Sequence, residues 1–572
     1  MESESAIADE AVHRGDHGLA LSHGTLPLRR PSILWVIPLF AVSSFVTAIR
    51  ASSLNDVYMR VGCLAFPPEV DFPTSYDNHT MFEVPPKLLS WSIFASSPVT
   101  AGALQVERDY PCSPFGDAMY AIGFMQVTLY TITLLLNIAM CAWWGQRADV
   151  WGRTVVLAIS SAAATTNDIN LVLVSHFLPR KPHLWLLPGA IFQGLFGGTA
   201  SYPAMMGYLG DTSSPRHRSI VFSVNGGIMA ASYGLGTLLG SWTNSPSTPV
   251  IGFTYISLAW NAIAMMLWIF VVPDSFPPEI RVTTEQQPPD RRRRSYLMLP
   301  LDVLLAPIRP FSILIPRVKD DVQGSRGREW SLLLLAGVAV VVSLGSDAAR
   351  MFLWSFRWSH VPPDRADLTT YFTVRELIDL FTKAAFLLFG VLGIVMFCRT
   401  RFFKYQTMPV ALPGQEEQLL PGQVYNLEAQ SEHDVGTSAT PALRPADDPP
   451  TSWTDFSAAR IMILGCAVLF AAALLPVPLL QEAGTVLGIS MDYGVNFCLQ
   501  ALALTFVPGK MNHAGKLFGV WNALLQTTWI WADIFRDMLN EYVWRSSRVF
   551  LAVAIATLGL SYLALMLVRK RV

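Results

Sequence analysis

The sequence predicts an all-α membrane protein whose twelve transmembrane helices form two six-helix halves. Hydrophobic residues make up 52% of the 572 residues and charged residues only 15%, whereas about a quarter of an ordinary soluble protein is charged. Twelve apolar runs approach the ~20 residues that cross a bilayer. A polar stretch, 273–330, separates the first six runs from the last six, and this separation predicts two halves.

The predicted spans follow one another along the whole chain. They are 32–49, 117–143, 154–177, 184–207, 217–241, 250–272, 331–354, 371–397, 459–480, 484–507, 515–535 and 549–568. The segments predicted around and between them are a disordered N-terminus (1–31), an N-terminal half (32–272), a central loop (273–330), a C-terminal half (331–568), an insert (399–457) and a short tail (569–572). The insert is rich in Pro, Glu and Gln and predicts a disordered linker.

Lys and Arg near the spans predict the orientation, because they accumulate on the cytoplasmic side. The runs Arg291 to Arg294 and Lys570 to Arg571 place the central loop, the insert and both termini in the cytoplasm. The loop 50–116 is then extracytoplasmic, and Asn78 begins its glycosylation sequon Asn-His-Thr. Cys63 and Cys112 lie on this oxidising side and are candidates for a disulfide, with two free thiols as the alternative.

One charged turn interrupts the apolar N-terminal half. The segment GQRADVWGRTVVL, residues 145–157, joins the second and third predicted spans. An aspartate at a helix end can accept bonds from a nearby arginine and from the N-terminus of another helix. We therefore predict that Asp149 binds Arg153 and the start of a helix in the other half; the alternative is a solvated charged turn.

This turn resembles the loop signature of the major facilitator superfamily, usually GxLADxxGRR. The resemblance implies a twelve-span transporter in which Gly145, Asp149, Gly152 and Arg153 form a conformational gate. Arg147 and Thr154 depart from the usual pattern.

Two further segments, 194–222 and 501–526, are similar to the proton-coupled folate transporter group and its fungal relatives. Glycines at 227, 236 and 240 match part of the antiporter signature in the fifth span. The resemblance implies export of a fungal secondary metabolite. Close helix packing is the alternative explanation of these glycines.

Ionisable residues inside spans are costly, by ~2.5–3.5 kcal/mol or more, and are functional candidates. In the seventh span, Asp347 and Arg350 are three residues apart, which predicts a pair. The eighth span carries Arg375, Asp379 and Lys383 on one face, with Glu376 beside them. That face is predicted to line a central cavity; the alternative is that Asp379 pairs with a basic neighbour on its own helix.

The tenth span carries Asp492 near its middle, with Asn496 one turn later and no basic residue within a turn. A desolvated carboxylate there could take up and release a proton in an alternating-access cycle. The alternative places Asp492 closer to the outer surface. Asp168 in the third span is a second candidate of this kind.

These observations predict a proton-coupled secondary transporter for a small organic molecule, with a cationic or amine-bearing compound as the suggested substrate and efflux as the direction. The alternatives are import of a nutrient by proton symport and a non-transporting receptor on the same scaffold. The predicted partners are the solute, protons and the lipid bilayer, for a monomer in the plasma membrane or, alternatively, a vacuolar or other internal membrane. The six cysteines lack metal-ligand spacing, and no motif indicates an enzyme, a cofactor, a metal or nucleic-acid binding.

Overall fold

The computed structural model describes ten stretches of the chain, and the structural statements below concern these residues. They are 31–65, 117–177, 182–243, 252–275, 306–320, 326–359, 368–406, 452–507, 513–543 and 548–569.

Seven helices form what we call the N-terminal half: α2 (Ile33–Ala65), α5 (Asp117–Trp151), α6 (Arg153–Phe177), α7 (Pro182–Phe196), α8 (Gly198–Thr212), α9 (Arg218–Thr243) and α10 (Gly252–Phe270). The C-terminal half consists of α13 (Ser331–Ser359), α14 (Leu368–Ala385), the π-helix η6 (Phe386–Gly390), α15 (Val391–Gln406), α16 (Ser452–Ala473), α17 (Pro478–Thr505), α18 (Ala514–Val543) and α19 (Arg548–Arg569). Between the halves lie a short 3-10 helix, η4 (Arg309–Leu314), and an antiparallel hairpin of β1 (Arg317–Asp320) and β2 (Arg326–Glu329), with Arg317 opposite Glu329.

The helices have the length and composition of membrane spans. Within the described residues, nine are long and apolar enough to cross a bilayer: α2, α5, α6, α10, α13, the α14–α15 unit, α16, α17 and α19. The predicted span 184–207 corresponds to α7 together with α8, 217–241 to α9, and 515–535 to α18. These four helices are not among the nine. The all-α membrane fold is confirmed, and the count of twelve spans stays a prediction.

Two predicted spans of the N-terminal half differ clearly from the structure. Helix α2 continues to Ala65, well past the predicted end at 49, so Arg50 lies in a helix rather than in a loop. The predicted fourth span is interrupted at Gly197, whose carbonyl accepts a bond from Ser160 Oγ at 3.1 Å. The same carbonyl accepts the backbone N–H of Ala200 at 2.9 Å, so a side-chain donor is inserted beside a tightened backbone bond at this break.

The other boundary differences concern the two cytoplasmic segments. The central loop contains the β1–β2 hairpin, which no sequence pattern predicted. The insert is shorter than predicted, because α15 extends to Gln406 and α16 begins at Ser452.

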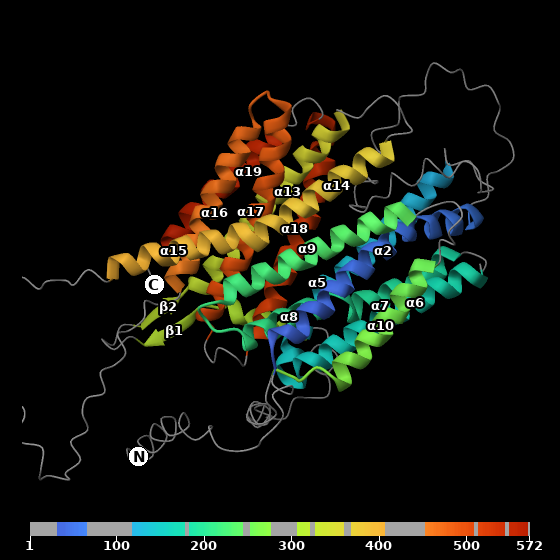
Figure 1. The fold of residues 1–572 in the computed structure, drawn as a ribbon, viewed down its shortest axis with the longest axis horizontal. Helices are drawn as coiled ribbons and strands as arrows, with labels where there is room; N and C mark the ends of the chain where they lie inside the picture. The colour runs from blue at the N-terminus through green and yellow to red at the C-terminus, as the bar shows by residue number, and fades with distance from the viewer. Residues whose placement is uncertain are drawn as a thin grey trace, which may run out of the picture.

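The two halves lie side by side. In Figure 1 the helices α13, α14, α16, α17 and α19 group on one side and α2, α5, α6, α7 and α10 on the other, with α9 and α18 between the groups. The helix pairs that join the halves include α5 with α18, α8 with α18 and α9 with α14.

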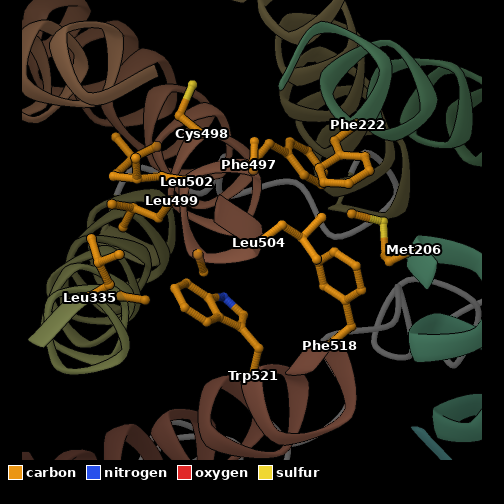
Figure 2. Close-up of a cluster of buried hydrophobic side chains, with 14 of the residues drawn as sticks. Met206, Phe222, Leu335, Phe497, Cys498, Leu499, Leu502, Leu504, Phe518 and Trp521 are labelled. Atoms are coloured by element: carbon orange, nitrogen blue, oxygen red, sulfur yellow. The ribbon is translucent and has the colours of Figure 1, made fainter. Parts of the chain in front are cut away.

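Apolar side chains form the core of this junction near the predicted cytoplasmic end. Figure 2 shows Met206 of α8 and Phe222 of α9 facing Leu504 of α17 and Phe518 of α18. The rings of Phe222 and Phe518 meet edge to face, with centroids 5.6 Å apart and planes at 83°. In an edge-to-face pair the positive edge of one ring meets the negative face of the other, which is favourable. The described halves are thus packed together here rather than separated by a cavity.

Candidate functional site

Asp149 joins the two halves at the end of α5. One carboxylate oxygen, Oδ1, accepts the backbone N–H of Gly515 at 2.9 Å, and Oδ2 accepts that of Lys516 at 2.7 Å. Both donors belong to the first turn of α18, where backbone N–H groups lack helical acceptors. The carboxylate therefore caps a helix of the opposite half, as the sequence predicted, and its negative charge faces the positive end of the helix dipole.

Arg153 completes this contact from the N-terminal half. Its Nη1 lies 2.6 Å from Asp149 Oδ1, and its Nε lies 3.3 Å from Asp211 Oδ2 of α8. The backbone N–H of Arg153 donates to Asp274 at 3.1 Å. Burial raises the pKa of Asp211 to about 6, against the opposing effect of Arg153. We call Asp149, Arg153, Asp211 and the first turn of α18 the cytoplasmic latch.

Two glycines of the motif are required by this geometry. A Cβ on Gly145 would overlap the carbonyl oxygen of Gly515 and come within 3.0 Å of the Gly519 Cα, so α5 and α18 touch backbone to backbone. Gly152 has φ of 105° between α5 and α6, a conformation that residues with a side chain rarely adopt. The loop signature thus encodes a close approach and a sharp turn as well as charges.

A second polar contact joins the halves. Ser219, in the first turn of α9, donates its hydroxyl to Asp455 Oδ1 of α16 at 2.7 Å, and both residues are buried. The neighbouring Arg218 donates through Nε to the carbonyl of Gly210 at 3.3 Å. A carboxylate of the C-terminal half therefore binds at the start of a helix of the N-terminal half.

Charged residues also gather inside the C-terminal half. Arg350 Nη1 and Asp347 Oδ1 are 2.8 Å apart, which confirms the predicted pair. Thr528 of α18 donates to the other Asp347 oxygen at 3.1 Å, and Arg350 Nη2 donates to the Tyr493 hydroxyl of α17 at 2.7 Å. Both oxygens of Asp347 are thus occupied, and the pair ties α13 to α17 and α18.

Asp492 is buried beside this pair, with 4% of its surface exposed. Asn496 donates to its Oδ1 at 3.4 Å. Lys383 of α14 lies over the Tyr493 ring, with Nζ 3.1 Å from the ring centroid, and both Lys383 and Arg350 act electrostatically on Asp492. The burial argues against the alternative that placed Asp492 near the outer surface, while the basic neighbours come from other helices rather than from α17. We call Asp347, Arg350, Lys383, Asp492 and Tyr493 the buried charge cluster.

The eighth predicted span supplies a separate ion network. Asp379 binds Arg357 of α13 with both oxygens, at 2.7 Å each, so the predicted alternative of pairing with Arg375 or Lys383 on its own helix is wrong. Arg375 instead pairs with Glu482 of α17, which also lies 3.3 Å from Arg357. The planar guanidinium of Arg357 donates to both oxygens of the Asp379 carboxylate at once. Such a bidentate pair is stronger than a single charge-assisted bond.

Two further candidates lie away from the charge cluster. Asp168 is fully buried; Arg50 of α2 lies 2.9 Å from its Oδ1, and Ser257 and Asn261 of α10 donate to its Oδ2 at 2.8 and 2.9 Å. Its charge is compensated on both oxygens, which favours a structural role. Glu376 is close to Asp379 and acts electrostatically on Tyr233 of α9, so it faces the N-terminal half.

Replacing Asp168 with asparagine is expected to lower stability while leaving transport per folded molecule unchanged. Removing one member of a buried ion pair costs about 3–5 kcal/mol, so the thermal unfolding midpoint of the purified protein should fall by several degrees. Thr166→Ala, at an exposed neighbour that bonds only within its own helix, is the control. Lost transport at unchanged thermal stability would contradict the structural role.

Some predicted sites lie outside the described residues. Asn78 and Cys112 fall in the stretch 66–116, and the side chain of Cys63 is not described, so the glycosylation and disulfide predictions stay predictions. Within the part of the chain that the structure describes, no group of His, Cys, Asp or Glu is arranged to hold a metal ion.

Several residues of the site escaped the sequence analysis. Arg357 follows the predicted end of the seventh span, and Glu482 lies between two predicted spans. Tyr493 adjoins Asp492 and could have been found as its neighbour. Asp211 and Asp455 were hidden because their partners come from helices that are distant in sequence.

Comparison with known proteins identifies the family. The model of the Major Facilitator Superfamily matches residues 113–398, half of the chain. The chain belongs to the Major Facilitator Superfamily. It is therefore a multi-pass membrane protein with the fold of a secondary transporter, a class that moves small molecules across the lipid bilayer.

Solved structures of transporters are also similar to this chain. The human organic anion transporter MFSD10 (TETRAN) matches with a TM-score of 0.55 and 13% identity, covering 94% of this chain and 100% of that one. This likeness supports the fold. A bacterial homologue of the iron transporter ferroportin, in an outward-facing state with soaked iron, matches with a TM-score of 0.47 and 11% identity, covering 91% and 99%.

A curated relative covers less of the chain. An uncharacterized membrane protein of Schizosaccharomyces pombe is 23% identical over 189 residues, which are 32% of this chain. The aligned part spans only 28% of the length of that protein.

Proposed function

We propose that the protein couples proton movement to transport of a small organic molecule by alternating access between its two halves. The observation that carries this proposal is the burial of Asp492 near the middle of α17, next to Asp347, Arg350 and Lys383. Secondary transporters place coupling groups near the bilayer midplane, where they are exposed to each side in turn. A buried carboxylate inside a span is costly, and a proton-carrying role accounts for that cost.

The residues of the cluster take different roles in this proposal. Asp492 carries the proton, and Asn496 orients its carboxylate through the bond to Oδ1. Asp347 is held by Arg350 and Thr528, so it acts as the fixed counter-charge that positions Arg350. The bond from Arg350 to Tyr493 links the two aspartates across α13 and α17.

The cytoplasmic latch is the proposed gate. In this conformation Asp149 and Arg153 hold α5 against the first turn of α18. Opening that end requires Asp149 to release two backbone N–H groups, which water then solvates. The gate therefore favours a conformation closed at the predicted cytoplasmic end, and solute binding must offset the lost bonds for the cycle to proceed.

The sequence resemblance favours export as the direction of transport, with a fungal secondary metabolite as the solute and the plasma membrane as the location. Import by proton symport is the second candidate, and a specific observation favours it. A Cβ on Gly236 would overlap the carbonyl oxygen of Phe45 in α2, and one on Gly227 would lie 2.7 Å from Leu388 Cγ. These glycines have packing roles, so their partial match to an antiporter signature is weaker support for export.

Asp492→Asn tests the proton site. We expect this variant to lose solute accumulation driven by a pH gradient in proteoliposomes, because an amide cannot carry the proton, while solute exchange without a gradient continues. The control is Arg460→Gln, which removes a basic residue bonded to Tyr562 outside the charge cluster. An unchanged pH dependence in Asp492→Asn would overturn this role.

Inside-out and right-side-out vesicles, each with an imposed pH gradient, separate the two directions. Proton-driven accumulation in inside-out vesicles supports export, and uptake confined to right-side-out vesicles with acid outside supports symport. A panel of metabolites that includes aromatic amines, aromatic acids and folates covers the solute classes.

A further inference from the structure

The buried charge cluster presents its cations to a ligand more than its carboxylates. The side chain of Arg350 is 30% exposed, whereas that of its partner Asp347 is 5% exposed. Asp492 is also buried, at 4%, while Lys383 is partly exposed. A solute that reaches this cluster therefore meets guanidinium and ammonium groups before it meets a carboxylate.

Three carboxylates of the span interiors, Asp347, Asp379 and Asp168, are already compensated. Asp347 uses one oxygen for Arg350 and the other for Thr528. Asp379 uses both oxygens for Arg357, and both oxygens of Asp168 are bound as well. An organic cation would have to displace an arginine from a buried pair to reach one of them, which leaves a buried charge without its partner. These three carboxylates therefore do not favour the cationic substrate suggested by the sequence.

The two cations converge on one aromatic side chain. Arg350 of α13 donates to the Tyr493 hydroxyl at 2.7 Å, and Lys383 of α14 lies 3.1 Å from the centre of the same ring. Among the described residues, Lys383 forms no ion pair. Lys383 interacts with Asp492 electrostatically but makes no direct ion pair with it, and a bound anion would give this ammonium group a direct partner inside the span.

We propose that the transported solute is an organic anion whose charged group binds between Lys383 and Arg350, beside Tyr493. This inference rests on the proposed transport function and names its substrate class. Arg350 contributes a positive guanidinium that is already bonded to Asp347 and Tyr493, and Lys383 contributes a point charge, so the ammonium group is the direct contact for a carboxylate.

The same arrangement fixes the sign of coupling to protons. With Asp347, Asp492, Arg350 and Lys383 all ionised, the charges of the cluster cancel; a proton on Asp492 leaves one net positive charge. Asp492 is faced by Asp347 and Arg350 from α13, Lys383 from α14 and Cys466 from α16, with Tyr493 beside it on α17. An anion thus binds more tightly when Asp492 is protonated, and by linkage the anion favours the proton. Proton and anion then move together, which favours symport.

Ligand binding to the purified full-length protein tests the substrate class. The probes are aromatic and aliphatic carboxylic acids, each with its neutral amide and its matched amine, and the readout is the shift of the thermal unfolding midpoint with concentration. We expect acids to stabilise the protein and their amides and amines to do so far less. Stabilisation by amines alone, or by no acid, would overturn the proposal.

Lys383→Gln locates the site. Acid binding should weaken roughly tenfold, equivalent to ~1.4 kcal/mol, whereas Arg460→Gln should bind as the parent protein does. If Lys383→Gln binds acids with the same affinity as the parent protein, acids do not bind at Lys383. Because Lys383 lies outside the ion pairs, this variant is expected to fold, and circular dichroism checks that it does.

The pH dependence of acid binding separates this inference from the proton-coupling proposal. We expect affinity to rise as the pH falls, and Asp492→Asn to bind acids with little pH dependence. Acid binding that needs Lys383 but does not vary with pH would support the anion site and count against Asp492 as the proton carrier. Loss of proton-driven flux in Asp492→Asn, together with binding of amines alone, would support Asp492 as the proton carrier and overturn the anion site.

Discussion

Asp149→Asn is expected to open the predicted cytoplasmic end and to reduce transport strongly. The carboxylate accepts two backbone N–H groups of α18 and pairs with Arg153. Asparagine keeps one oxygen but turns an NH₂ group toward a donor and removes the charge. Charge-assisted bonds contribute about 1.5–3 kcal/mol each, so the closed conformation should lose about 3 kcal/mol, roughly a hundredfold in its equilibrium.

Native cysteines can report this opening. Cys141 of α5 is fully buried against α18, where Gly519 faces its backbone. Its alkylation rate, followed by mass spectrometry of peptides after digestion, should rise in Asp149→Asn. Cys466, buried within the C-terminal half and bonded to the Gly488 carbonyl, should not change. Gln146→Ala, at an exposed position of the same turn, is the matched control; equal Cys141 rates in all three proteins would rule out the gate.

Gly145→Ala is expected to have a comparable effect for a steric reason. The added methyl group would overlap the Gly515 carbonyl oxygen, which belongs to backbone and cannot rotate away. The ends of α5 and α18 must therefore separate, and Asp149 loses its reach to the first turn of α18. We expect transport in proteoliposomes to fall at least about tenfold, the change that ~1.4 kcal/mol would produce.

The control for this variant is another helical glycine. A Cβ on Gly337 of α13 meets nothing within 4 Å, so Gly337→Ala adds the same methyl group without a clash and gains helix propensity. This control should transport as the parent does. A Gly145→Ala protein with full transport and unchanged Cys141 alkylation would show that the close approach of α5 and α18 is dispensable.

Much of the fold follows from sequence because a bilayer leaves few choices. Apolar runs of span length must be helical, and each of the twelve predicted runs overlaps a described helix or helix pair. The end of α2 at Ala65 and the break at Gly197 could not be read in this way. The first extends beyond an apolar run, and the second depends on the Ser160 hydroxyl of a neighbouring helix.

The candidate site is predictable where its contacts are local or carried by a motif. The pair Asp347–Arg350 lies within one helical turn, and the partner of Asp149 followed from the loop signature and the helix dipole. Asp379 shows the opposite case. Two basic neighbours lay one turn away on its own helix, but Arg357 of α13 offers a bidentate geometry, and nothing in a single sequence ranks a partner from another helix above a local one.

The contact between Ser219 and Asp455 gives the latch a counterpart. Helix α18 is the fifth helical unit of its half, and α9, where Ser219 lies, is the fifth of the other. In each half an aspartate thus binds the start of the fifth helical unit of the other half: Asp149 binds α18, and Asp455 binds α9. If the two halves rock as rigid bodies, they must release both contacts together. We therefore expect the closed end to open in one cooperative step, with a free-energy barrier that contains both sets of bonds.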